Sequence, residues 1–374
     1  MVNRDEEASK ARNTPSNRLG WVDLIRVVSA FLVVVIHIGW QGDQTSSTYY
    51  TLLRGALPDT HWLFANFVDT FMWCAIPLFF MVSGYLILNK PNSLKHGYFK
   101  RLLKIGIPLF AWSIIYLIIR YWLYGVDHMG NPPSIYNGIR CILTNNVAAH
   151  FWFLYVLLSL YIAAPILRSY LKSASRENKI YFILLLGCAC FLWPIISDVL
   201  KMLFDINKVN FDFYIVSGFV GYFVAGYLLG QQAISPRICL LCLISFTLIT
   251  IIITVVGLYF FESEIVRSEL ANYLRIPLVL MLFTVLKYVG DADFYQRSRV
   301  LIGVSHLAPL TFGIYLIHSL IVHAFVGGLF GFSLSINTFA PWYSIPLMAT
   351  LVYALSALIV WLLKKIPLMH WILP

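Results

Sequence analysis

The chain has 374 residues, of which 60% are hydrophobic and only 12% are charged, and its mean hydropathy is +0.77. Soluble domains carry about 25% charged residues, so this composition excludes a water-soluble globule. We interpret the net charge of +10 as a device that orients a membrane protein, and we expect no nucleic-acid partner.

Apolar runs bounded by charged and turn residues predict an all-α polytopic membrane protein, because about 20 helical residues cross a hydrocarbon layer roughly 30 Å thick. Most of the 27 Lys and Arg residues fall on the side that would hold both termini, so we predict that both termini are cytoplasmic. Residues 1–20 then form a polar cytoplasmic tail, and residues 21–374 form one membrane domain. The ten predicted spans lie near residues 21–40, 62–88, 105–124, 150–168, 180–199, 213–230, 238–261, 272–288, 308–330 and 342–363.

The cysteine pattern indicates no disulfide, redox or metal chemistry. Five of the six lie inside apolar runs, where cysteine behaves as a small hydrophobic residue. Cys239 and Cys242 form a C-x-x-C pair, but no neighbouring His or acidic residue completes a redox or metal motif. We therefore predict no disulfide framework and no metal site.

The first predicted span contains three ionisable residues on one face. Asp23 precedes Arg26 by three residues, and the 11 steps from Arg26 to His37 end only about 20° past three full turns. An ionisable group near the bilayer centre costs at least about 2.5 kcal/mol, so such a stripe predicts a lined cavity. The alternative is an interfacial Asp23/Arg26 pair with a separate His at the outer headgroups.

Four motifs in chain order resemble the membrane acyltransferase-3 family. The Arg26 and His37 spacing, in a helix that opens with Asp-Leu-Ile-Arg, is the first. A Phe-Phe-x-x-Ser-Gly sequence at residues 79–84 resembles the second-span signature of that family. A Trp-x-Leu segment starts at Trp152, and a late Tyr-Leu-x-His motif runs from Tyr315 to His318.

The resemblance implies an enzyme of the bacterial inner membrane that transfers an acyl group, usually acetyl from cytoplasmic acetyl-CoA. The implied acceptor is a sugar hydroxyl of a surface polysaccharide or a lipid-linked glycan. Acetyl-CoA would be a co-substrate, and no permanently bound cofactor is expected. His37 would act as general base on the acceptor hydroxyl or as a transient acyl carrier, since imidazole suits both tasks.

The cytoplasmic Arg-x-x-Arg of the family appears here as Arg101-Leu-Leu-Lys104, preceded by Lys100. Lysine keeps the charge but loses the bidentate fork of arginine. We predict that these three residues, together with Arg26, bind the CoA phosphates or orient the donor. The alternative is a set of ordinary positive-inside residues.

Further candidates line the predicted cavity or support His37. Asp69, in the outer half of the second span, is a candidate partner that would orient His37, or else a solvated residue at a loop end. Ser83 precedes Gly84 and fits close helix packing better than a nucleophile. Four residues could contact substrate, with an interfacial belt or a structural hydrogen bond as the alternatives: Trp152, Tyr155, Tyr315 and His318.

Two other functions compete with acyl transfer. Ten spans with embedded charges are also typical of a secondary transporter or a flippase for a lipid-linked sugar, but no internal repeat is visible. A membrane sensor or partner-binding protein with a decayed acyltransferase site is the third hypothesis. The retention of Asp23, Arg26 and His37 on one face argues against that reading.

Overall fold

The computed structural model describes residues 19–39, 60–89, 98–204, 218–259, 264–329, 331–334 and 338–374. All regular secondary structure in these ranges is helical, which confirms the all-α class. Seven helical segments are long and apolar enough to cross a membrane, as expected for a polytopic membrane protein. These segments are Gly20–Ile38, Asn66–Asn89, Phe99–Tyr124, Trp152–Ser173, Pro236–Leu258, Arg299–Val326 and Pro341–Leu363.

The other three predicted spans fall on helices that are not among these seven. They correspond to α9 (Arg176–Gly187) with α10 (Trp193–Phe204), to α11 (Val220–Gly230) and to α13 (Glu264–Asp291). A π-helical turn over Cys188–Leu192 separates α9 from α10, and α11 has only 11 residues. The count of ten spans and the cytoplasmic placement of both termini therefore stay predictions, and residues 1–18 of the predicted tail lie outside the described ranges.

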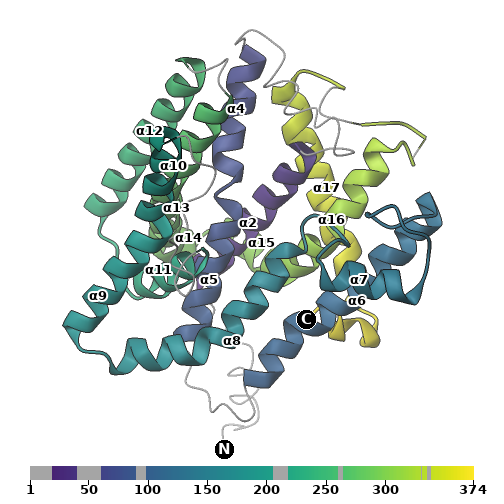
Figure 1. Ribbon diagram of the computed structural model, residues 1–374, viewed down its shortest axis with the longest axis horizontal. Coiled ribbons are helices and arrows are strands. Elements are labelled where there is room, and N and C mark those ends of the chain that lie inside the picture. Colours follow the sequence, from purple (N-terminus) through teal and green to yellow (C-terminus); the bar gives the residue numbers. More distant parts are fainter. Residues whose placement is uncertain are drawn as a thin grey trace, which may run out of the picture.

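The first spanning helix, α2 (Gly20–Gly39), runs through the middle of the bundle (Figure 1). Ile25, Val34 and Ile38 of α2 are fully buried, as expected for a helix that is apolar on most sides and surrounded by others. The helix packs against α5 (Ala75–Asn89), α13, α16 (Thr311–Val326) and α17 (Pro341–Leu363).

The remaining helices surround this centre. α12 packs on α13, and both stand beside α4 on the side of the bundle away from α6 and α7 (Figure 1). α8 lies between α5 and α6 and contacts both. Their bounds are α4 (Thr60–Met72), α6 (Phe99–Tyr124), α7 (Ile135–Leu143), α8 (Trp152–Ser173), α12 (Pro236–Tyr259), α14 (Asp293–Gln296) and α15 (Arg299–Leu307).

Local sequence signals explain several helix ends. Ser134, Ser175 and Ser298 each precede a helix, and each hydroxyl accepts the backbone N–H three residues further on. Such caps satisfy one of the orphan donors at a helix start. After α6, Gly125 takes a φ of +72°, the left-handed conformation that glycine adopts without a Cβ penalty.

α5 and α11 cross at very close range through two glycines. A Cβ on Gly84 would lie 1.8 Å from the carbonyl oxygen of Phe223, and a Cβ on Gly226 would lie 2.0 Å from that of Met81. Small residues let two helix backbones approach in a membrane, where packing rather than water drives association. The expected packing role of the Ser83-Gly84 pair is thus visible at Gly84.

We expect Gly84→Ala to lower the thermal stability of the detergent-solubilised protein, because the added methyl group meets backbone rather than a movable side chain. Overpacking of this kind costs about 1–3 kcal/mol or more. Gly106→Ala on α6 is the matched control, since its added Cβ would meet nothing within 4 Å beyond the adjacent backbone of its own helix. Equal unfolding temperatures for the two variants would contradict the close crossing.

Candidate functional site

Three histidine rings meet inside the bundle, from three separate segments of the chain. His37 lies near the end of α2, His150 just before α8, and His318 in the middle of α16. The ring centroids are 4.7 Å apart for His37 and His318, 5.5 Å for His37 and His150, and 5.1 Å for His150 and His318. The structure therefore brings together two predicted residues, His37 and His318, and adds His150.

Backbone contacts determine which nitrogen of His37 and His318 carries the proton. Nδ1 of His37 lies 2.9 Å from the carbonyl oxygen of Val33, and Nδ1 of His318 lies 2.8 Å from that of Tyr315. A carbonyl oxygen only accepts, so each neutral ring donates from Nδ1. The lone pair is then on Nε2 in both rings, which leaves two basic nitrogens in one cluster.

The cluster contains polar atoms with no partner in the described structure. His318 is fully buried, and its Nε2 has no hydrogen-bond partner. His150 is 3% exposed, and neither of its ring nitrogens is bonded. An unsatisfied buried polar group costs about 1–3 kcal/mol, so three such atoms together indicate a place where a polar ligand or water binds.

Two tyrosines hold the His150 segment against α16. The hydroxyl of Tyr315 donates to the carbonyl oxygen of His150 at 2.5 Å, and that of Tyr116 donates to the carbonyl oxygen of Leu316 at 2.8 Å. Both rings also contact the imidazole of His150, with centroids 5.3 and 5.5 Å away. The predicted cavity residue Tyr315 thus positions His150 through the backbone.

The loop that leads to His150 is braced by a buried carboxylate. Asp127 accepts the backbone N–H groups of Met129 at 2.8 Å and Asn131 at 2.9 Å, and its other oxygen lies 3.3 Å from the thiol of Cys141. Burial alone would raise the pKa of Asp127, but these hydrogen bonds lower it below its usual range. Burial and the same carboxylate raise the pKa of the Cys141 thiol to about 11.

The polar residues at the start of α2 lie at the opposite end of the helix from His37. Asp23 and Arg26 form an ion pair at 3.9 Å. Because α2 is continuous, the 11 residues from Arg26 to His37 correspond to about 16 Å along its axis. The start of α2 lies beside the end of α5, where the ring centroids of Trp21 and Tyr85 are 4.7 Å apart.

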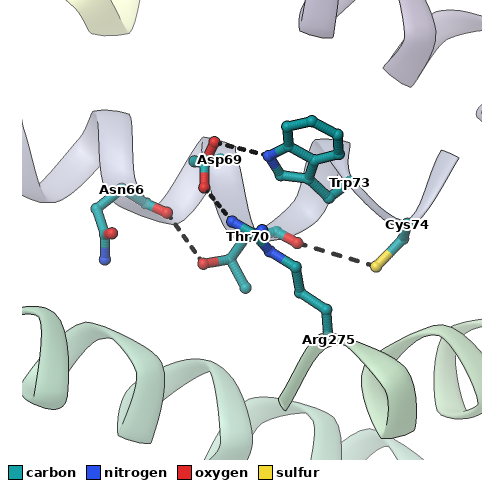
Figure 2. Close-up of polar contacts among 6 residues, drawn as sticks. All are labelled: Asn66, Asp69, Thr70, Trp73, Cys74 and Arg275. Atoms are coloured by element: carbon teal, nitrogen blue, oxygen red, sulfur yellow. Dashed lines mark hydrogen bonds and ion pairs between the residues drawn. The ribbon is translucent and has the colours of Figure 1, made fainter. Parts of the chain in front are cut away.

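The structure places Asp69 in a different contact from the one predicted. Its carboxylate accepts the indole N–H of Trp73 at 3.0 Å and pairs with the guanidinium of Arg275 on α13, as Figure 2 shows. His37 instead faces His318 and His150, so the expected orienting pair of His37 with Asp69 is not formed. The carboxylate of Asp69 pairs instead with Arg275, which is 206 residues away in the chain.

The contact in Figure 2 joins α4 to α13. The guanidinium carbon of Arg275 also lies 5.4 Å from the centre of the Trp73 ring, in cation–π range. Sequence reasoning missed this arginine, although a charged residue inside a predicted span is itself a signal for a partner. His150 is harder to recognise as a site residue from the sequence, because it stands at the edge of a predicted span.

A pocket of about 470 Å³ lies at the Arg26 end, between α5, α6 and α8. Arg101, one of the predicted donor-binding residues, lines it, whereas Lys100 and Lys104 are exposed and do not line it. Two cations of α8 that were not predicted, Arg168 and Lys172, line the same pocket.

The other predicted cavity residues pack against neighbouring elements. Trp152 lies on Phe219 with ring centroids 5.4 Å apart. Tyr155 donates its hydroxyl to the carbonyl oxygen of Ile142 at 2.5 Å, which ties α8 to α7. Ser83 lies on α5, which packs against α8. In the described part of the chain, no group of three or more His, Cys, Asp or Glu side chains is arranged to hold a metal ion.

Comparison with known proteins gives one match. The model of the acyltransferase-3 family, described as an acyltransferase domain, matches residues 19–363. No curated protein and no solved structure matches the chain. The family match confirms the resemblance drawn from the four motifs, and it gives no support to a transporter or flippase.

Proposed function

The chain belongs to the acyltransferase-3 family, and from this premise we propose that it transfers acetyl from acetyl-CoA to a hydroxyl of an envelope glycan or lipid-linked sugar. Membership supports acyl transfer, and the long apolar helices support a membrane enzyme. The choice of acetyl-CoA, of a sugar hydroxyl and of the bacterial inner membrane is part of the proposal.

The observation that carries the proposal is the pair of basic nitrogens in the histidine cluster. Nε2 of His37 and Nε2 of His318 both present lone pairs, because both Nδ1 atoms are committed to backbone carbonyl groups. Such a cluster accepts hydrogen bonds and therefore favours a ligand that donates them. A hydroxyl group donates one hydrogen bond, and its proton is the one that a general base must remove.

In the proposed reaction, Nε2 of His37 takes the proton of the acceptor hydroxyl while the oxygen attacks the thioester carbonyl carbon. The new C–O bond forms and the C–S bond breaks, so the acyl group moves to the acceptor. The departing thiolate then takes the proton from the His37 imidazolium. CoA leaves as a thiol, and His37 returns to its neutral form.

The other two histidines would hold the acceptor. His318 offers a second lone pair from Nε2, and His150 offers one N–H and one lone pair, both unpartnered. At the other end of α2, Arg26 and Arg101 would face the donor, whose phosphates are anionic. The axial distance of about 16 Å from Arg26 to His37 suits an extended donor that enters from one end.

We expect inner-membrane vesicles that contain the protein to incorporate label from acetyl-CoA labelled in the acetyl group into alkali-labile esters on envelope glycans. Vesicles from the same host without the protein are the control. A second donor preparation, labelled in the adenine ring, should leave no label on glycans. The measurement is the radioactivity of the glycan fraction before and after mild alkali.

Two results would contradict the proposal. Equal incorporation in both vesicle preparations would assign the transfer to another enzyme of the host. Accumulation inside the vesicles of a separately added, labelled lipid-linked sugar, with no ester formed from labelled acetyl-CoA, would instead indicate transport.

A further inference from the structure

The pocket beside Arg101 lies at an irregularity in α8, because Pro165 is one of its lining residues. Pro165 has no N–H, so the carbonyl oxygen of Tyr161, four residues earlier, has no helical donor. The hydroxyl of Tyr98 donates to that oxygen and fastens the start of α6 to α8. Arg101 of α6, three residues after Tyr98, lines the same pocket as the last turns of α8.

The pocket has the size and the mixed lining of a ligand site. Its volume of about 470 Å³ is within the range of about 300–1,000 Å³ that is typical of small-molecule pockets. One wall is apolar, and three cations with several hydroxyl groups form the rest. The lining residues are Ile87, Tyr98, Arg101, Ala164, Pro165, Arg168, Ser169, Lys172 and Ser173.

The described lining of this pocket is rich in positive charge. No Asp or Glu is among its described lining residues, although Arg101, Arg168 and Lys172 all face it. Arg168 and Lys172 are four residues apart on α8, a spacing at which like charges repel. Nε of Arg168 is buried and has no hydrogen-bond partner among the residues that the structure describes. An anion that bridges the cations would relieve the repulsion and satisfy this N–H.

We propose that Arg168 and Lys172 of α8 are phosphate ligands of this pocket, which with Arg101 binds the phosphate groups of a nucleotide thioester donor. Arginine binds phosphate through its planar fork, and lysine binds it as a point charge. The inference rests on the proposed function, and it adds a second helix to the donor site. The apolar wall of Ile87 and Ala164 would contact the uncharged part of the donor.

The test measures binding to the purified, detergent-solubilised full-length protein, and it does not depend on acyl transfer. The probes are CoA, 3′-dephospho-CoA and pantetheine, which carries no phosphate. We expect Arg168→Gln and Lys172→Gln each to weaken CoA binding about tenfold or more, since a charge-assisted hydrogen bond contributes about 1.5–3 kcal/mol. Pantetheine binding should not change, and Arg168→Lys should recover part of the CoA affinity.

The control variant is Arg176→Gln, which removes an exposed cation at the start of α9 that does not line the pocket. Its CoA affinity should equal that of the wild type, and unfolding temperatures of all variants verify that they fold. With labelled acetyl-CoA, the pocket variants should raise KM and leave kcat near the wild-type value.

Three outcomes would overturn the proposal. Equal CoA affinity in the wild type and in both pocket variants would show that α8 does not bind the donor, and it would leave the proposed function intact. If CoA does not bind the wild type at all, the donor assignment of the proposed function fails as well. If nanodiscs with phosphatidylglycerol stabilise the wild type over Arg168→Gln while CoA does not, the phosphate comes from a lipid headgroup.

Discussion

Replacement of His37 by alanine is expected to lower the rate of acyl transfer by about 10²- to 10⁴-fold, the range that a general base contributes. The reason is geometric: the Nδ1 contact with Val33 leaves Nε2 as the basic atom of a partly buried ring. The measurement is the initial rate of ester formation from labelled acetyl-CoA in vesicles with equal amounts of each protein.

The matched control for this experiment is His306→Gln on α15. His306 is exposed, and its Nδ1 also bonds to a carbonyl oxygen one turn earlier, that of Ile302, at 2.7 Å. The control therefore removes the same local bond without touching the cluster, and it should retain near wild-type activity. If His37→Ala retains more than about a third of the wild-type rate while folding normally, His37 is not the base.

The same assay separates the roles of the three rings. His150→Gln and His318→Gln each remove an imidazole that would hold the acceptor but would not take its proton. We expect smaller losses than for His37→Ala, and chiefly a higher KM for the acceptor. If either variant loses as much kcat as His37→Ala, the histidine replaced in that variant is the general base instead.

The largest effect on stability is expected at Arg275. In Arg275→Met the carboxylate of Asp69 loses its guanidinium partner, and the cation–π contact with Trp73 is lost as well. The two charged side chains are only 16% and 18% exposed, and breaking such a pair from one side costs about 3–5 kcal/mol. The measurement is the unfolding temperature of the detergent-solubilised protein.

The double variant Asp69→Leu with Arg275→Met identifies the cause of that loss. Replacing both partners of a buried ion pair by apolar residues is often close to neutral, so the double variant should recover much of the lost stability. Arg275→Lys keeps a positive charge and should lie between the wild type and Arg275→Met. Equal instability of the single and double variants would mean that Arg275 acts through packing instead.

Some features of the site can be predicted from the sequence, and others cannot. The spacing of Arg26 and His37 on one helix is a local property, and a helical face can be read from residue numbers alone. His150 stands at a helix edge, and nothing in its neighbours shows that it meets His37 and His318. The partner of Asp69 was missed for the same reason, because Arg275 is 206 residues away in the chain.

The membrane environment, the all-helical class, the family and the catalytic candidate His37 can all be inferred from the sequence, because composition, periodicity and short motifs are local quantities. The contacts between side chains that are distant in the chain, by contrast, are visible only in the tertiary structure. Helix crossings such as the one at Gly84 bring distant segments within contact, and Arg168 and Lys172 of α8 line one pocket with Arg101 of α6. Each such meeting depends on the packing of several helices at once, so no single segment encodes it.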